Sequence, residues 1–174
     1  MNSVEDFRPI NPVYSIKFIN SVQISDLFEQ YEKIYPKSKF MGCSAIDTIN
    51  KDLSALDDLK SKNINGLIYV INIDKSSGPG IRWISLYVDS NKNNIYLFDP
   101  YLPSSYSKCI YPEINNFIKT INKYFVNWKN IPIEVIENNE CYDGDNSYIF
   151  SILVVINLMK GLTFEASTLN LHNS

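Results

Sequence analysis

GPGIRWISLYVDSNKNNIYLFDP, residues 78–100, predicts a β-hairpin. The first strand is expected over Ile81–Asp89, and the return strand over Asn94–Asp99 after a polar turn of Ser, Asn and Lys. Two strand-like runs joined by a short polar segment are typical of antiparallel neighbours. The hairpin places Arg82 and Asp99 at its open end, and these two charged residues raise the question of function.

Helices and further strands are expected on both sides of this hairpin, and their order predicts an α+β fold. FMGCSAID, residues 40–47, is expected as a loop that leads into a helix, with Ser44 and Asp47 forming a capping box. The other helices are expected from Ser25 to Pro36, over Glu113–Phe125 and from about Asn146 to Lys160, and the other strands over Leu67–Ile73 and Ile131–Ile136.

The length of 174 residues is that of one domain with a substantial core. Within it we expect an N-terminal arm over 1–22, a helical part over 23–62, a core over 63–160 and a C-terminal tail over 161–174. The sequence holds no internal repeat or low-complexity tract that would indicate another arrangement.

Composition argues against several classes of function. A net charge of -3, with lysines scattered along the chain, gives no support for nucleic-acid binding. Cys43, Cys109 and Cys141 lack paired spacing, and the single histidine is His172, so we expect no disulfide framework, metal site or cofactor. The N-terminus does not resemble a signal peptide, and Tyr148–Met159 is too short to span a bilayer. We therefore expect an intracellular protein that is neither secreted nor held in a membrane.

Four stretches follow one another in a suggestive order: FMGC at 40–43, GPGIRWISLYVD at 78–89, NIYLFDPY at 94–101 and NECYDGDNSYIFSILVVINL at 139–158. Together they resemble the adenovirus-type cysteine proteases (adenain) and, more distantly, the Ulp-type deconjugating proteases. The resemblance covers about residues 40 to 160. It implies a papain-like or adenain-like cysteine protease core, with a mixed, mostly antiparallel sheet flanked by helices.

In that family a histidine before Trp is the general base, an acidic residue orients it, a cysteine attacks the peptide carbonyl and a glutamine stabilises the oxyanion. The matching positions here hold Arg82, Asp99, Asn146, and either Asn139 or Glu140. A guanidinium stays protonated and cannot act as a base, and an amide is no nucleophile. We therefore expect a catalytically inactive homologue. With the hairpin turn centred near Ser90 and Asn91, Arg82 and Asp99 would face each other as an ion pair.

The leading hypothesis is a structural or protein-binding component of a virus, associated with the virion. The abundance of Asn, Ile, Lys and Tyr suits the AT-rich genome of a virus, a parasite or an endosymbiont. Trp83 and Tyr101 are candidate contacts for an extended peptide of a protein partner. Two alternatives stay open: an active cysteine peptidase that uses Cys141 as a displaced nucleophile, and an unrelated α+β adaptor. The sequence indicates no oligomeric state.

Overall fold

The computed structural model describes residues 20–49, 55–61, 63–80, 82–101, 111–138 and 147–169. The elements in these ranges are α1 (Ser21–Ile34), β1 (Ser38–Ala45), α2 (Ala55–Ser61), β2 (Gly66–Asn72), β3 (Trp83–Asp89), β4 (Asn94–Phe98), α3 (Pro112–Lys129), β5 (Glu134–Glu137), α4 (Ser147–Met159) and α5 (Phe164–Leu169). Among the helices in these ranges, none has the length and hydropathy needed to cross a membrane.

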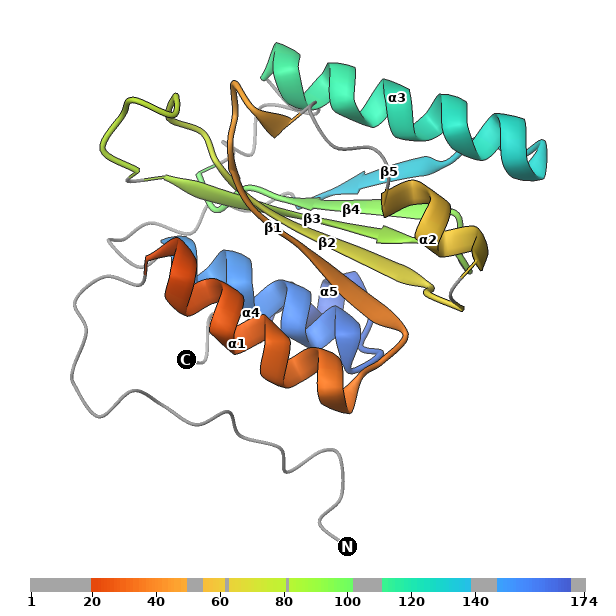
Figure 1. Cartoon of the computed structure of the whole chain (residues 1–174), viewed down its shortest axis with the longest axis horizontal. Helices are drawn as coiled ribbons and strands as arrows, with labels where there is room; N and C mark the ends of the chain where they lie inside the picture. The colour runs from red at the N-terminus through yellow and green to blue at the C-terminus, as the bar shows by residue number, and fades with distance from the viewer. Residues whose placement is uncertain are drawn as a thin grey trace, which may run out of the picture.

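The five strands form one mixed sheet in the order β1-β2-β3-β4-β5. The outer pairs, β1–β2 and β4–β5, are parallel, and β3 is antiparallel to both of its neighbours. Helices α1, α4 and α5 cover one face of the sheet, and α2 and α3 cover the other (Figure 1). This mixed sheet between two helical layers confirms the predicted fold class.

Strand β2 shows why its sequence is almost entirely apolar. Leu67, Tyr69 and Ile71 belong to the core beneath α2 and α3, whereas Ile68 and Val70 belong to the core beneath α1 and α4. Successive side chains of a strand point to opposite faces. A central strand covered on both faces therefore needs apolar residues at every position, and all seven residues of β2 are buried.

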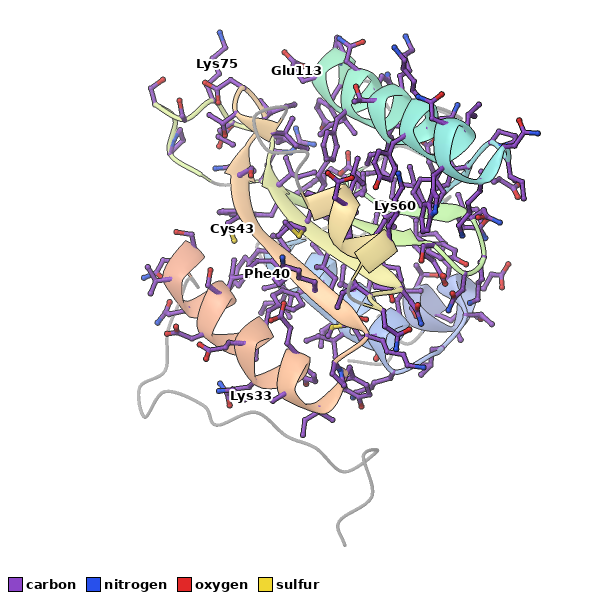
Figure 2. The ribbon with its side chains drawn as sticks, turned by 45° about the vertical axis from the view of Figure 1, so that its right-hand side comes forward. Lys33, Phe40, Cys43, Lys60, Lys75 and Glu113 are labelled. Atoms are coloured by element: carbon purple, nitrogen blue, oxygen red, sulfur yellow. The ribbon has the colours of Figure 1, made fainter. Side chains whose placement is uncertain are left out.

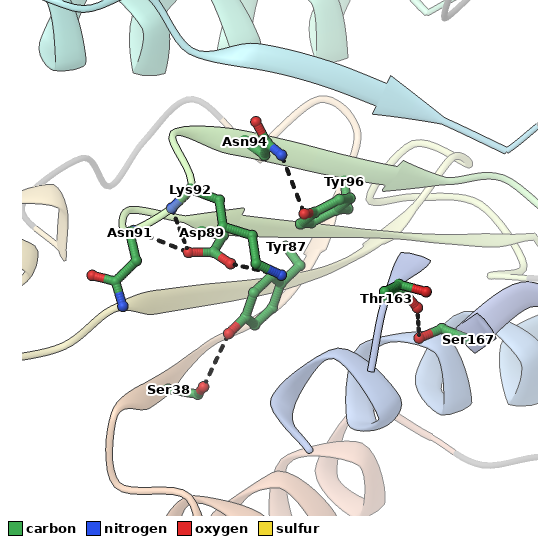
Figure 3. A network of polar contacts seen from close by, with 9 residues as sticks. All are labelled: Ser38, Tyr87, Asp89, Asn91, Lys92, Asn94, Tyr96, Thr163 and Ser167. Carbon is green, nitrogen blue, oxygen red and sulfur yellow. Dashed lines mark hydrogen bonds and ion pairs between the residues drawn. The ribbon is translucent and has the colours of Figure 1, made fainter. Parts of the chain in front are cut away.

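The hairpin forms as predicted, but its turn lies further along the chain. Asp89 pairs with Asn94, so the turn is centred on Asn91 and Lys92. The Asp89 carboxylate accepts hydrogen bonds from the backbone N–H groups of Asn91, at 3.0 Å, and Lys92, at 3.1 Å (Figure 3). Asn93 then takes a left-handed conformation, with φ at 56°, which Asn tolerates better than most residues. These local preferences fix a four-residue turn and the register of both strands.

The predicted loop over residues 40–47 is instead mostly the edge strand β1. Gly42 has a φ of +94°, and the pairing with β2 shifts between Phe40 and Cys43. A bulge of this kind disturbs the alternation that identifies a strand in a sequence. The N–H of Phe40 donates to the carboxylate of Glu32 on α1, which ties the strand to that helix.

The predicted capping box of Ser44 and Asp47 is also wrong. Ser44 lies within β1, and the Asp47 carboxylate accepts hydrogen bonds from the N–H and the hydroxyl of Ser76, both at 2.9 Å. The short helix α5 was not expected, and the predicted strand over Ile131–Ile136 is formed only from Glu134 onward. The other helices and strands agree with their predicted positions to within a few residues.

Candidate functional site

The open end of the hairpin brings together residues from both of its strands. Arg82 directly precedes β3, whereas Asp99 and Tyr101 follow β4. Ser85 pairs with Phe98, and continuing this register by three residues places Tyr101 opposite Arg82. The guanidinium of Arg82 lies over the Tyr101 ring, 4.4 Å from its centroid. The expected pairing of Arg82 with Asp99 across the ladder is therefore wrong by two residues, because the turn is shifted.

Asp99 is a buried carboxyl that is held by other groups. Only 3% of the residue is exposed, and its Oδ1 accepts a hydrogen bond from the Tyr101 N–H at 2.9 Å. Burial raises the pKa of Asp99, and the Tyr101 N–H, the charge of Arg82 and the hydroxyl of Tyr111 act in the opposite direction. Arg82 thus influences Asp99 through its charge while its guanidinium stacks on the tyrosine.

Asn138 is a site residue that the sequence analysis missed. Its Oδ1 accepts the N–H of Asp99 and its Nδ2 donates to the carbonyl of Asp99, both at 2.8 Å. The side chain is 5% exposed and directly follows β5, the parallel neighbour of β4. An asparagine at the end of a strand beside the LFDP segment was the available signal, because adjacent parallel strands end at the same edge of a sheet.

The start of α4 is fixed close to the same end of the sheet. The hydroxyl of Ser151, which is fully buried, donates to the carbonyl of Trp83 at 2.8 Å. The indole N–H of Trp83 donates to the carbonyl of Gly80 at 2.9 Å, and the ring packs against the core beneath α1 and α4. The indole ring of Trp83 therefore contributes to packing and to the fold. The contact with Ser151 places the first two turns of α4 beside the beginning of β3, near Arg82 (Figure 1).

The remaining candidate residues divide into those the structure describes and those it does not. Cys43 lies on β1, where burial raises the pKa of its thiol to about 12 (Figure 2). At neutral pH this thiol is protonated, and the thiolate is the nucleophilic form. Several candidates lie outside the described residues: Cys109, Asn139, Glu140, Cys141, Asn146 and His172.

No protein-family model matches the chain. It is 26% identical over 166 residues to "Putative thiol protease R355" of Acanthamoeba polyphaga mimivirus, a match that covers 91% of this chain and 53% of the relative. The chain thus spans about half the length of this relative.

Solved structures of two proteases superpose on most of this chain. The ASFV pS273R protease superposes with a TM-score of 0.67 at 10% identity, over 86% of this chain and 60% of that chain. The C-terminal protease domain of Ulp1, in complex with SMT3, the yeast ortholog of SUMO, superposes with a TM-score of 0.58 at 12% identity, over 87% of this chain and 72% of that chain. The chain has the Ulp-type cysteine protease fold.

The prediction that this protein of the Ulp-type fold is not an enzyme is wrong. The mimivirus relative is named as a thiol protease, and the structural neighbours are cysteine proteases, including Ulp1 structures in which the catalytic cysteine is oxidised. The prediction inferred loss of activity from Arg82 and Asn146, the residues at the positions of the family's histidine and cysteine. Activity depends instead on which groups folding brings within reach of a substrate, and positions 139–146 lie outside the described residues.

Proposed function

We propose that this chain is an intracellular viral protein, associated with the virion, that uses its cysteine-protease-like fold to bind a protein partner. An extended segment of the partner would lie at the open end of the β3–β4 hairpin. The observation that carries the proposal is the stacked pair of Arg82 and Tyr101, with Trp83 following Arg82 in the sequence as the first residue of β3. All three residues are partly exposed at one end of the sheet.

Two comparisons support a protein as the partner. The Ulp1 protease domain was solved in complex with a protein, SMT3. The mimivirus relative, named as a thiol protease, comes from a virus. Aromatic residues and arginine are also the types that contribute most to binding energy at protein interfaces, and both occur in the Arg82–Tyr101 pair.

A selection of displayed random octapeptides on the full chain tests this function. Peptides selected on the wild type are measured for affinity on Tyr101→Ala and, as a matched control, on Trp128→Ala. The control removes a similar cation–aromatic pair at the turn end of the hairpin: Lys129 Nζ lies 4.7 Å from the Trp128 ring on α3 and hydrogen-bonds to Asn93 in the turn. Following the peptides by mass spectrometry ensures that binding is measured on intact molecules.

We expect Tyr101→Ala to weaken binding by about tenfold or more, as for an aromatic residue central to an interface. Trp128→Ala should change the affinity by less than about twofold. If no peptide is enriched, or if both variants bind the selected peptides as the wild type does, the proposed site is refuted. Copurification of the chain with virions tests the proposed association with the particle.

A further inference from the structure

Of Arg82 and Asp99, the charged pair described at the open end, Arg82 is the more exposed, and the inference drawn from it rests on the function proposed above. Asp99 is 3% exposed, whereas Arg82 is partly exposed. The Oδ1 atom of Asp99 accepts the hydrogen bond of the Tyr101 N–H, so this carboxyl oxygen already has a partner within the chain. A bound segment therefore meets the guanidinium rather than the carboxyl.

The guanidinium of Arg82 keeps hydrogen-bonding capacity unused. Stacking on Tyr101 occupies a face of the planar group, but its five N–H donors lie in the plane. The Nε atom is buried and has no hydrogen-bond partner in the described structure. An unsatisfied charged donor is costly in a folded protein and calls for an explanation. Burial closes the Nε to a ligand, so a ligand acceptor in the guanidinium plane would meet the other N–H groups of this partly exposed side chain.

The Tyr101 ring also fixes the orientation in which Arg82 is presented. The backbone of both residues is held: the Arg82 carbonyl accepts the Ile73 N–H from the neighbouring chain segment, and the Tyr101 N–H donates to Asp99. A guanidinium held in one orientation loses little conformational entropy when it forms a two-point contact. Planar carboxylates match this arrangement, with two parallel N–H···O bonds.

We propose that Arg82 binds a carboxylate of the partner segment, carried either by an acidic side chain or by a chain terminus. Two carboxylates in the described part of the chain are already bound elsewhere. Asp99 accepts the Tyr101 N–H, and Asp47, near the loop before β3, accepts two hydrogen bonds from Ser76. Arg82 thus acts as the specificity-determining contact of the peptide site.

The test uses four pools of fluorescein-labelled octapeptides made from Ser, Thr, Val and Tyr in random order. Each pool has either Glu or Gln at one central position and either a free or an amidated C-terminus. Fluorescence anisotropy gives the affinity of each pool for the full-length wild type, Arg82→Gln, Arg82→Lys and a control, Lys75→Gln. Lys75 is exposed on the loop between β2 and β3, so the control removes one positive charge from the same region (Figure 2).

We expect Arg82→Gln to weaken binding of a carboxylate-bearing pool by about tenfold or more, with the neutral pool changed by less than about twofold. Arg82→Lys should fall between these values because it keeps the charge and loses the two-point geometry. Lys75→Gln should match the wild type. A preference lost on replacing Glu with Gln identifies a side-chain carboxylate, and one lost on amidation identifies the chain terminus.

The inference is overturned if the wild type binds neutral and acidic pools equally, or if Lys75→Gln removes the acid preference as fully as Arg82→Gln. Circular dichroism confirms that each variant is folded, and Arg82→Lys provides a second variant if Arg82→Gln is not. Binding that depends on Tyr101 but shows no acid preference refutes only this inference. Absence of any Tyr101-dependent binding refutes the proposed function as well.

Discussion

The two ends of the β3–β4 hairpin are built from the same two strands but hold their polar groups in different ways. At the turn, Asp89 binds the N–H groups of Asn91 and Lys92, its near neighbours in sequence (Figure 3). At the open end, Asp99 is held by Asn138, which is 39 residues away. The carbonyl of Trp83 is bound there by Ser151, which is 68 residues away.

This difference separates a structural end from a candidate functional one. Local hydrogen bonds at the turn set which residues of β3 and β4 pair, and the turn residues Ser90 and Asn93 are also bound by Asn65, Lys129 and Glu134. The open end is assembled from the ends of β4 and β5 and the start of α4, so its geometry depends on the complete fold. It also retains a buried carboxyl and a guanidinium Nε without a partner in the described structure. Groups of this kind are concentrated at functional sites.

Replacing Asn138 should produce the largest effect on stability. In Asn138→Ala the buried N–H and carbonyl of Asp99 both lose their partner, at a cost of about 1–3 kcal/mol for each group. We expect the free energy of unfolding, measured in urea, to fall by about 2–4 kcal/mol. Asn91→Ala, at the exposed turn, is the control and should cost less than about 0.5 kcal/mol. Equal effects at the two ends would contradict the distinction drawn between them.

Gly66→Ala tests whether packing also constrains the turn end. Gly66 pairs with Asp89, and a Cβ at this position would lie 2.2 Å from the hydroxyl oxygen of Tyr87. That hydroxyl is buried and lies 3.3 Å from the Ser38 hydroxyl (Figure 3). We expect a loss of about 1–3 kcal/mol in thermal or urea unfolding.

A second substitution makes the Gly66 prediction specific. Tyr87→Phe removes the atom closest to the added Cβ, so the cost of Gly66→Ala should be smaller in a Tyr87→Phe background. If the cost of Gly66→Ala is the same in both backgrounds, crowding by the tyrosine hydroxyl is not the cause. The crowding would then come from the ring carbons of Tyr87, which lie 2.6 and 2.9 Å from the added Cβ and which Phe keeps.

The parts of the fold that could be predicted are those whose signal is local. The run over Leu67–Ile73 and the helical stripe over Glu113–Phe125 carry their periodicity in neighbouring residues, and both elements form where expected. The strand β1 was missed because the left-handed Gly42 and the adjacent bulge break its alternation. The two-residue error in the hairpin register came from the turn, where Asn93 extends the loop to four residues.

The candidate site was predicted less completely, for a physical reason. The sequence paired Arg82 with Asp99 and separately predicted Tyr101 as a peptide contact, and the structure places all three at one end of the sheet. It did not identify which of them are in contact, because that depends on register. Asn138 was missed because its role follows from β5 lying beside β4, so its position at a strand end becomes a signal only once that neighbour is known.

The pH dependence of stability provides a graded test of the open end. Burial raises the pKa of Asp99 above its ordinary value of 3.8. The folded state therefore holds this proton more tightly than the unfolded state does, and the associated stability is fully present below pH 3.8. It is lost as the pH rises through the raised folded pKa. Relative to Asp99→Asn, the wild type should lose stability over this range, with a slope of at most about 1.4 kcal/mol per pH unit.

Urea unfolding at a series of pH values measures this difference. Asn at position 99 keeps an oxygen for the Tyr101 N–H, so the comparison isolates the proton. Asp89→Asn is the matched control at the turn. If the wild type instead loses stability relative to Asp99→Asn as the pH falls, the expected sign is reversed. The charge of Arg82 would then outweigh burial in setting the pKa of Asp99.

Lys92→Gln should have the smallest effect, although it removes an ion pair. Lys92 Nζ lies 3.8 Å from Asp89 Oδ2, but 53% of the lysine side chain is exposed, and exposed pairs contribute about 0–1 kcal/mol. We expect a change below about 0.5 kcal/mol in urea unfolding, which should shrink further at high salt. Asp89→Ala should cost more because its carboxylate also accepts two backbone N–H groups. If Lys92→Gln costs as much as Asp89→Ala, the turn depends on charge rather than on backbone hydrogen bonds, and the contrast with the open end disappears.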